Sequence, residues 1–274
     1  MKLWIDLFAK HELLDHASAI AFQVLKSLIP LTLLALALLG ALREQHVWRK
    51  TVAPAIKTHV QPATFHAIDT AVERIFSTDS TGLIVFAAVL ALWYISGSVR
   101  AVIGAINQIY ETEDDRPLHL RYAISFGLAA CIAVGVIGAL LFTIVAARLG
   151  GHGSLQVFAE VGRWIGGVVL LALSLGLLVR FAPAKPRPTR WISAGTLLVI
   201  VAWIGATLIF EQFVSHVANF RTATGSLTVF LVLIGYVYTS SIILLVGVEL
   251  DELLREDATA GEHGVLEVLF GVGK

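Results

Sequence analysis

Six long runs of apolar residues alternate with polar connections along the chain, and each run is long enough to cross a bilayer as a helix. A helix that spans the hydrocarbon core needs about 20 predominantly apolar residues, whereas a helix on the surface of a soluble protein is apolar along one stripe. The pattern therefore predicts an all-α, polytopic membrane protein with six transmembrane helices in one domain, residues 1–257. The expected spans are Ala17–Leu42, Leu83–Ile109, Tyr122–Ala147, Gly162–Phe181, Trp191–Phe210 and Leu227–Leu250.

The polar connections predict helices that lie on the membrane rather than across it. Residues 1–16 mix apolar and charged side chains, which is typical of an interfacial amphipathic helix or of a solvated helical segment leading into the first span. Residues 43–82 carry apolar residues at helical spacing and predict one or two amphipathic helices, too broken to cross the bilayer. Residues 258–274 are charged and then glycine-rich, and we expect a flexible tail.

Pro30 lies inside the first predicted span. Proline has no backbone N–H to donate, and its ring clashes with the carbonyl of the preceding turn. We therefore expect a bend or a break in this helix within one turn of Pro30.

The composition supports the membrane interpretation and argues against a nucleic-acid partner. Of the 274 residues, 57% are hydrophobic and only 15% are charged, whereas about 25% of the residues in a soluble domain are charged. The formal net charge is zero, so the whole chain has no field that would attract nucleic acid.

The distribution of cations predicts how the protein is oriented. Six spans place both termini on the same side of the membrane, and the totals of lysine and arginine on the two sides are nearly equal. The short loop Arg180–Arg190 is densely basic, and short loops have the most weight in the positive-inside rule. We therefore expect a multi-pass membrane protein with both termini in the cytoplasm.

The residues that enzymes use for chemistry do not form a recognisable constellation. The nine histidines are scattered, and none has metal-ligand spacing with a carboxylate or a thiol. Cys131 is the single cysteine. The sequence has no glycine-rich phosphate loop, no Gly-x-Ser-x-Gly motif and no paired carboxylates deep in a span. We therefore predict no catalytic residues, no metal and no cofactor.

Two cations inside the predicted spans indicate a ligand site. Lys26 and Arg100 each lie nine residues from the cytoplasmic end of their span, which places both about 13 Å deep at about 1.5 Å per residue. No acidic residue is expected at this depth, so an anionic ligand such as a lipid phosphate or a carboxylate would satisfy both cations. The alternatives are that both snorkel to the headgroups, or that Arg100 binds carbonyls freed at Pro30.

The polar residues around these cations form two stripes, and lipid cannot satisfy either stripe. We expect the stripes to face each other across a hydrated pocket in the cytoplasmic half, with Lys26 and Arg100 on its wall. Asn107 and Tyr236 are candidate ligand contacts, although helix–helix hydrogen bonds are the alternative role. The candidate ligand-binding residues are Gln23, Lys26, Arg100, Asn107 and Tyr236. The stripe residues are Trp93, Ser96, Gly97, Arg100, Gly104 and Asn107 on the second span, and Gln23, Lys26 and Ser27 on the first.

Four stretches of the chain, in order, resemble the YihY/BrkB family of bacterial inner-membrane proteins. The resemblance implies a six-span helical protein without a soluble catalytic domain. Members have been labelled both as a ribonuclease and as virulence or serum-resistance factors, and some are suspected of handling envelope lipids. The chain departs from the family pattern at Gln23 and Lys26, where aromatic or small uncharged residues are usual, and at Asp251, where asparagine is usual. The stretches are Ser18–Leu31, Leu92–Pro117, Arg180–Gly195 and Thr224–Glu252.

Two functions from different classes fit these observations. The first is a transporter or flippase-like protein for an anionic amphiphile or envelope lipid, with membrane lipids as partners. The alternative is a non-transporting scaffold that organises envelope or virulence-related proteins, and a homo-oligomer is compatible with both. An internal polar cavity would favour the first, whereas a solid core with a large exposed apolar patch would favour the second.

Overall fold

The computed structural model of the chain describes residues 10–59, 62–77, 80–149, 166, 169, 173–174, 176–184, 194–216 and 223–260. Within these residues every regular element is a helix, as the apolar pattern predicts. The long helices are α2 (Leu13–Ala41), α6 (Ser80–Ile109), α7 (Leu118–Leu149), α9 (Ala194–His216) and α10 (Ala223–Ala260). The short ones are α3 (Gln45–Val47), the π-helix η1 (Trp48–Val52), α4 (Ala53–His59) and α5 (Pro62–Ser77).

The five long helices correspond to five of the six predicted spans. Each is long and apolar enough to cross a membrane. Half of the remaining predicted span, Gly162–Phe181, lies outside the described residues, and its described residues, including 176–181, are helical. Of the predicted interfacial helix at residues 1–16, residues 1–9 lie outside the described residues, whereas residues 13–16 already form the first turn of α2. Most of the predicted tail at residues 258–274 also lies outside them, so the interfacial position of the first segment and the flexible tail stay predictions.

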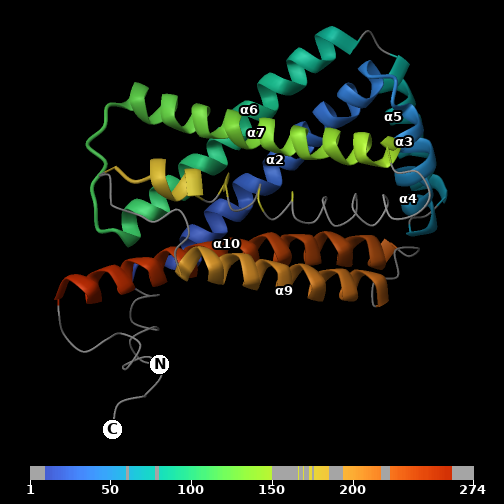
Figure 1. The fold of residues 1–274 in the computed structure, drawn as a ribbon. Coiled ribbons are helices and arrows are strands. Elements are labelled where there is room, and N and C mark those ends of the chain that lie inside the picture. Colours follow the sequence, from blue (N-terminus) through green and yellow to red (C-terminus); the bar gives the residue numbers. More distant parts are fainter. Residues whose placement is uncertain are drawn as a thin grey trace.

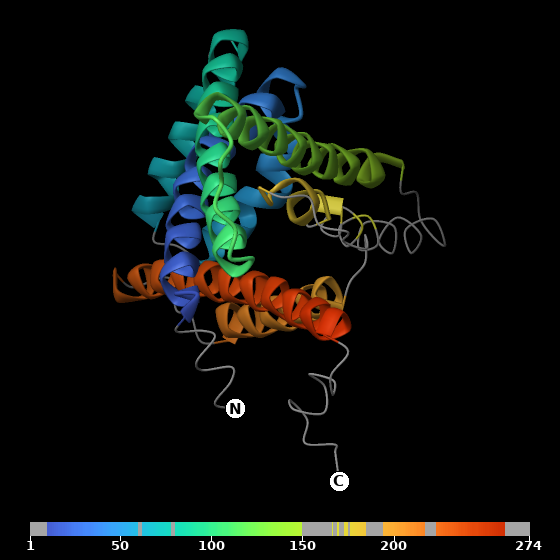
Figure 2. The same ribbon diagram turned by 90° about the vertical axis from the view of Figure 1, so that its left-hand side faces the viewer.

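The helices α2 and α6 form the centre of the molecule, side by side, as the two polar stripes predict (Figures 1 and 2). Helix α7 packs against α6, helix α10 packs against α2 and α6, and helix α9 packs against α10 (Figure 1). The contact between the central helices buries small and branched residues, including Ala17, Ala105 and Ile106. Outward-facing apolar residues such as Phe22 and Ile209 are 61% and 73% exposed, which fits helices that face lipid.

Both central helices end in a left-handed residue that is not glycine. Arg43 and Glu111 have φ angles of 57° and 47°. The next amide in each case bonds back to a carbonyl five residues earlier, from Glu44 to Leu39 and from Thr112 to Asn107, each at 2.9 Å. This is the Schellman arrangement, in which glycine is the usual left-handed residue. Each end therefore holds a side chain in a position that costs about 1–2 kcal/mol relative to glycine.

Helix α2 continues through Pro30 without interruption. The break that the sequence suggested is therefore absent. Pro30 is buried, and neighbouring helices in a membrane bundle support a helix at the position of a missing hydrogen bond. The sequence also allowed a bend at Pro30 in place of a break, and the bend stays a prediction.

The connection after α2 forms amphipathic helices, as predicted. Helices α3, α4 and α5 and the π-helix η1 fold together over a small apolar cluster of Trp48, Ala53 and Val72. The indole Nε1–H of Trp48 donates to Asp69 Oδ1 at 2.9 Å. This unit lies at the end of the molecule where α2 ends and α6 begins (Figure 1).

Helices α9 and α10 cross at two glycines. A Cβ placed on Gly195 would overlap the carbonyl oxygen of Gly247, and one on Gly247 would overlap Val199. The backbones can approach this closely only because neither residue has a side chain. The same contact lets Asp251 Oδ1 accept the backbone N–H of Gly195 at 2.8 Å, which satisfies an amide in the first turn of α9.

Candidate functional site

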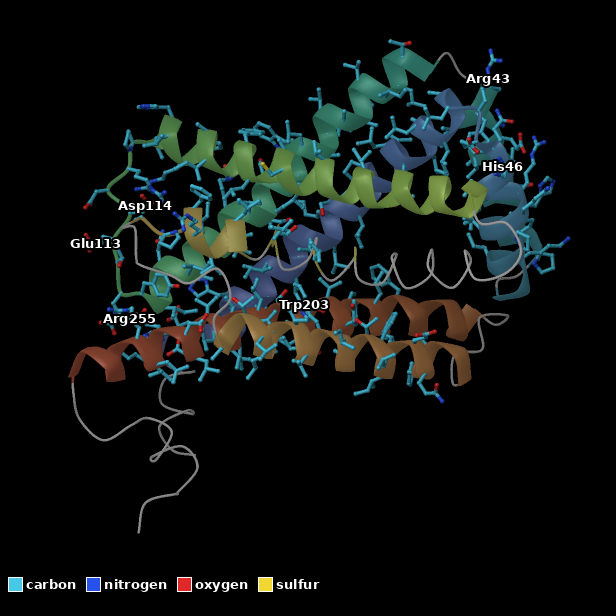
Figure 3. The ribbon with its side chains drawn as sticks, in the orientation of Figure 1. Arg43, His46, Glu113, Asp114, Trp203 and Arg255 are labelled. Carbon is cyan, nitrogen blue, oxygen red and sulfur yellow. The ribbon has the colours of Figure 1, made fainter. Side chains whose placement is uncertain are left out.

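One end of the molecule gathers the polar side chains that the helices carry. The start of α2, the end of α6, the start of α7 and the end of α10 all meet there. Figure 3 shows Glu113 and Asp114 in the loop that joins α6 to α7, on the same side of the molecule as Arg255, whereas Arg43 and His46 lie at the opposite end. We call the end that carries Glu113, Asp114 and Arg255 the pocket end.

A pocket of about 270 Å³ lies between the last turns of α6, the loop of residues 110–117 and the first turns of α7. Helix α6 contributes Arg100, Gly104 and Asn107 to the wall. These residues lie at positions i, i+4 and i+7 and therefore share one face of the helix. A Cβ placed on Gly104 would meet no atom within 4 Å, so this glycine leaves the wall open. The pocket is lined by Arg100, Ile103, Gly104, Asn107, Asp114, Arg116, Arg121 and Ile124.

Asp114 organises the loop side of the pocket. Its carboxylate accepts from Arg116 through Nε at 2.8 Å and Nη2 at 3.2 Å, and it lies 3.6 Å from Arg121 Nε. The backbone N–H of Arg116 also donates to Asp114 Oδ1, at 3.1 Å, which fixes the turn. Arg121 donates in addition to the backbone oxygens of Asp114 and Arg116. One carboxylate thus orients two guanidinium groups that line the pocket.

The pKa of Asp114 reflects these contacts. Burial raises the pKa of the carboxyl, but the side-chain and backbone hydrogen bonds from Arg116 and the charges of Arg116 and Arg121 outweigh burial. The net effect lowers the pKa below its ordinary value of 3.8. Asp114 is therefore ionised at neutral pH, and its charge is committed to the two arginines.

Arg100 keeps donors available for a ligand. Its Nη1 donates to Ser96 Oγ at 3.0 Å, and its Cζ lies 4.7 Å from the ring centroid of Tyr122 on α7. No carboxylate in the described part of the chain forms an ion pair with it. A guanidinium has five N–H donors, so one hydrogen bond and one ring contact leave most of its capacity unused.

Asn107 joins α6 to the segment that follows residues 176–181. Its Oδ1 accepts the backbone N–H of Ala184 at 2.9 Å, and Arg116 Nη2 donates to the carbonyl of Ala182 at 2.9 Å. Asn107 therefore makes a structural hydrogen bond, although its partner lies just after a helix and not within one as the alternative had it. It also lines the pocket, so its amide nitrogen lies near any ligand there.

Gln23 reaches across from α2 to α6 at Gly97. Gln23 Oε1 and Arg100 Nη2 lie 3.3 Å and 3.7 Å from the position that a Cβ of Gly97 would take. Both polar groups therefore lie beside Gly97, which has no side chain to exclude them. Neither Gln23 nor Gly97 is a lining residue of the pocket.

Lys26 does not line this pocket with Arg100, so its role in ligand binding stays a prediction. The Lys26 ammonium lies 5.1 Å from the ring centroid of Phe22 and 5.4 Å from that of Tyr94, in cation–π contacts. Tyr94 and Arg100 are six residues apart, about 240° around α6 at 100° per residue. Equal depth in the membrane therefore does not place two cations on one wall, and Arg100 turns towards α7.

Tyr236 lies in a different contact. Its hydroxyl is 3.0 Å from Thr207 Oγ1, and its ring centroid is 4.6 Å from that of Phe210. Both partners belong to α9, so Tyr236 connects α10 to α9. It does not line the pocket, and the structural alternative fits it.

Sequence reasoning missed the loop residues that complete the site. Three consecutive acidic residues, Glu113, Asp114 and Asp115, follow α6, and such a run is by default a solvated surface. Glu113 and Asp115 are exposed, but the side chain of Asp114 is only 13% exposed. The available signal was Arg116 two residues later, since an aspartate can bind the backbone and side chain of the second residue after it.

Long apolar helices around a small polar pocket, with apolar side chains facing outwards, define a multi-pass helical membrane protein. The sequence model described as virulence factor BrkB matches residues 5–265. The chain therefore belongs to this bacterial membrane-protein family, and the resemblance of the four stretches is confirmed. It is similar to the ribonuclease-like protein YfkH of Bacillus subtilis (strain 168), with 24% identity over 263 residues, 92% of this chain and 94% of that protein. No solved structure matches.

Proposed function

We propose that this protein binds the headgroup of an anionic amphiphile, such as an envelope lipid, in the pocket and moves it across the bilayer. The observation that carries the proposal is Arg100, which lies inside a span, lines the pocket and has no carboxylate partner in the described part of the chain. A charged residue within a span is costly, by about 2.5–3.5 kcal/mol on insertion scales. An anionic ligand would offset that cost with charge-assisted hydrogen bonds.

The charge and size of the pocket narrow the ligand class. Three arginines and one aspartate line it, so its walls carry excess positive charge. About 270 Å³ holds roughly nine water molecules at about 30 Å³ each. This volume suits a phosphate or carboxylate headgroup but not an acyl chain. The chains would therefore lie outside the pocket, against apolar faces such as that of Trp93, which is 56% exposed and contacts Phe126 of α7.

Lipid binding tests the first half of the proposal. Native mass spectrometry would compare the wild type with Arg100→Ala, using anionic phosphatidylglycerol and zwitterionic phosphatidylethanolamine. Arg100→Ala should weaken phosphatidylglycerol binding about tenfold or more, because a hydrogen bond to a charged group contributes about 1.5–3 kcal/mol. Phosphatidylethanolamine binding should change little.

Lys26→Ala is the matched control. It removes a second cation at similar depth that does not line the pocket. Phosphatidylglycerol binding should therefore stay within about twofold of wild type. That change is well below the tenfold or greater loss expected for Arg100→Ala, where a factor of ten corresponds to about 1.4 kcal/mol. An equal loss of both lipids in Arg100→Ala, or the same loss in Lys26→Ala, would mean that the cations only anchor the helices.

Transport is tested separately, because a protein can bind a lipid without moving it. Proteoliposomes containing fluorescent phosphatidylglycerol would report its exchange between leaflets by the fraction that a membrane-impermeant quencher reaches. The wild type should raise that fraction above one half, and Arg100→Ala should not. Binding without exchange would instead favour the scaffold hypothesis.

The proposal also includes the inner membrane as the location and the absence of catalysis. The name of the relative YfkH refers to a ribonuclease-like protein, which makes RNA the relevant substrate to test. The purified protein should leave a mixed RNA substrate intact over hours. Cleavage that copurifies with the wild type and is lost in a site variant would contradict this part.

A further inference from the structure

The pocket carries more positive charge than one singly charged anion can balance. Its lining sets Arg100, Arg116 and Arg121 against one carboxylate, Asp114, so three positive charges exceed one negative charge by two. The side chains of Arg116 and Asp114 are only 16% and 13% exposed, and charges that are partly buried are screened less than charges in open solvent. An anion with two negative charges therefore balances the lining, whereas a monoanion leaves one positive charge uncompensated.

Asn107 adds a neutral donor to the wall of the pocket. The residue is only 7% exposed. The backbone N–H of Ala184 is a donor, so it pairs with the amide oxygen of Asn107, at 2.9 Å. The amide nitrogen of Asn107 is then left without a hydrogen-bond partner among the described residues. A buried donor without a partner costs free energy, and an oxygen of a ligand in the pocket would satisfy it.

The guanidinium groups of the lining also present donors. Arg100 uses Nη1 to bind Ser96 Oγ at 3.0 Å, and its Nη2 donates to no acceptor among the described residues. Arg116 uses Nε and Nη2 to bind Asp114 and the carbonyl of Ala182, which leaves its Nη1. A guanidinium has no acceptor atom, so these groups can pair only with acceptors of a ligand.

The side-chain acceptors of the lining are already occupied. Asp114 Oδ1 accepts both the backbone N–H and Nε of Arg116, and Asp114 Oδ2 accepts Nη2 of Arg116 and lies 3.6 Å from Nε of Arg121. The amide oxygen of Asn107 accepts the N–H of Ala184. A headgroup with hydroxyl or ammonium donors therefore meets no unoccupied side-chain acceptor among the lining residues. A doubly ionised phosphomonoester presents three acceptor oxygens and no donor.

We infer that the pocket selects a phosphomonoester dianion over a phosphodiester monoanion. The three arginines supply the charge, and Asn107 is a specificity-determining residue because its amide nitrogen requires an acceptor. The same group occurs as the terminal phosphate of a lipid and in small soluble phosphates, and the pocket chemistry is the same for both. The inference deepens the proposed function, and it rests on that function only where the phosphate belongs to a lipid.

The first experiment compares two lipids that share their acyl chains. Thermal stabilisation of the full chain in a neutral detergent would be titrated with dioctanoyl phosphatidate and with dioctanoyl phosphatidylglycerol, which gives an apparent Kd for each. A phosphomonoester has a second pKa of about 6, so phosphatidate is a dianion at about pH 8 and a monoanion at about pH 5. Phosphatidylglycerol stays a monoanion at both pH values, so the ratio of the two affinities corrects for any titration of the protein.

The ratio should depend on pH. At about pH 8 phosphatidate should bind about tenfold or more tightly than phosphatidylglycerol, because the second charge adds charge-assisted hydrogen bonds. At about pH 5 the ratio should fall to about twofold or less, since both ligands then carry one charge. Equal affinities at the higher pH, or a ratio that does not change with pH, would overturn the inference.

Asn107→Asp tests the specificity-determining residue. Aspartate keeps an oxygen for the N–H of Ala184, but it replaces the amide nitrogen with an acceptor and removes one unit of the excess positive charge. The affinity for phosphatidate at about pH 8 should fall about tenfold or more, and the affinity for phosphatidylglycerol should fall less, so the two should become nearly equal. Gln108→Glu makes the same change at the next residue, which is exposed and does not line the pocket.

This control should keep the wild-type ratio of affinities. A wild-type ratio in Asn107→Asp as well would overturn the role of Asn107. If Asn107→Asp does not fold, the pH dependence of the ratio in the wild type tests the inference by itself.

A soluble ligand separates this inference from the proposed function. Glycerol 3-phosphate carries the same phosphomonoester without acyl chains, and stabilisation by it only at far higher concentrations than by phosphatidate would support both statements. Equal affinities for glycerol 3-phosphate and phosphatidate would keep the dianion site and defeat the amphiphile of the proposed function. Equal affinities for the two lipids that Arg100→Ala lowers together would defeat the dianion selection and leave the proposed function standing. Stabilisation by none of the three would defeat both.

Discussion

A single carboxylate, Asp114, determines the geometry of the pocket loop. It binds the side chain and the backbone N–H of Arg116, and it lies close to Arg121. Both arginines also donate to backbone carbonyls, Arg116 to Ala182 and Arg121 to Arg116 itself. The loop is therefore held by charge-assisted hydrogen bonds rather than by an apolar core, and its stability should depend on the ionisation of Asp114.

Asp114→Asn tests this dependence. At pH 7 the substitution should lower the free energy of unfolding by about 1.5–3 kcal/mol, because the amide cannot replace a charged acceptor. The folded pKa of Asp114 lies below its ordinary value of 3.8. The carboxylate therefore stabilises the protein above that value, and this stabilisation is lost as the pH falls through the lowered pKa. Thermal melting should show a large difference from wild type at pH 7 and a progressively smaller one as the pH falls below 3.8.

Glu113→Gln is the control for that measurement. Glu113 is adjacent and exposed, and no described residue pairs with it. Its substitution should leave the melting temperature unchanged at both pH values. A pH-independent effect of Asp114→Asn would mean that the side chain acts through packing rather than through its charge.

At the scale of the helices, the apolar pattern predicted well where the spanning helices lie in the sequence. It predicted only in part which helices and loops each of them packs against. All five observed long helices begin within four residues of the expected start, because a polar residue ends each apolar run. The rotation of a helix about its axis is harder to predict. Gly97 and Gly104 lie on one face of α6, yet the first meets Gln23 of α2 and the second opens into the pocket. Only the packing of α7 and of the loop of residues 110–117 distinguishes the surroundings of Gly97 from those of Gly104.

The close crossing of α9 and α10 gives a prediction at this scale. Gly195→Ala would place a methyl group against the carbonyl of Gly247 and within 2.6 Å of Asp251 Cγ. The helices would have to separate, which should cost about 1–3 kcal/mol. Gly205→Ala, in the same helix with nothing within 4 Å of its Cβ position, should be neutral or should stabilise by up to about 1 kcal/mol. Thermal melting in one detergent compares the two, and equal effects would contradict the close contact.

The whole molecule has two different ends. At one end α3, η1, α4 and α5 fold over the Trp48 cluster. At the other end the pocket, the His11–Glu249 pair and the start of α9 come together from segments far apart in the sequence. These contacts could not be read from the sequence, because each joins residues on different helices. His11 and Glu249 are 238 positions apart, and neither lies in a motif.

The pocket end should face the cytoplasm. The described cations do not decide the orientation, since lysines and arginines occur at both ends, for example Lys10 and Arg116 at one and Arg49 and Lys50 at the other. The short basic loop 180–190 favours a cytoplasmic pocket end, because short loops have the most weight in the positive-inside rule. Arg116 donates to the carbonyl of Ala182, and the backbone N–H of Ala184 donates to Asn107, so the start of this loop lies at the pocket end.

Cysteine labelling on a Cys131→Ser background tests this orientation. Asp115 and Lys50 are exposed at the pocket end and at the opposite end, so each accepts a cysteine without disturbing the core. In intact spheroplasts, a membrane-impermeant maleimide should label Lys50→Cys and should reach Asp115→Cys only after the membrane is permeabilised. Labelling of Asp115→Cys in intact cells would place the pocket on the outer face, where a ligand would enter from outside. That result would reverse the direction in which the proposed transporter loads its anionic ligand.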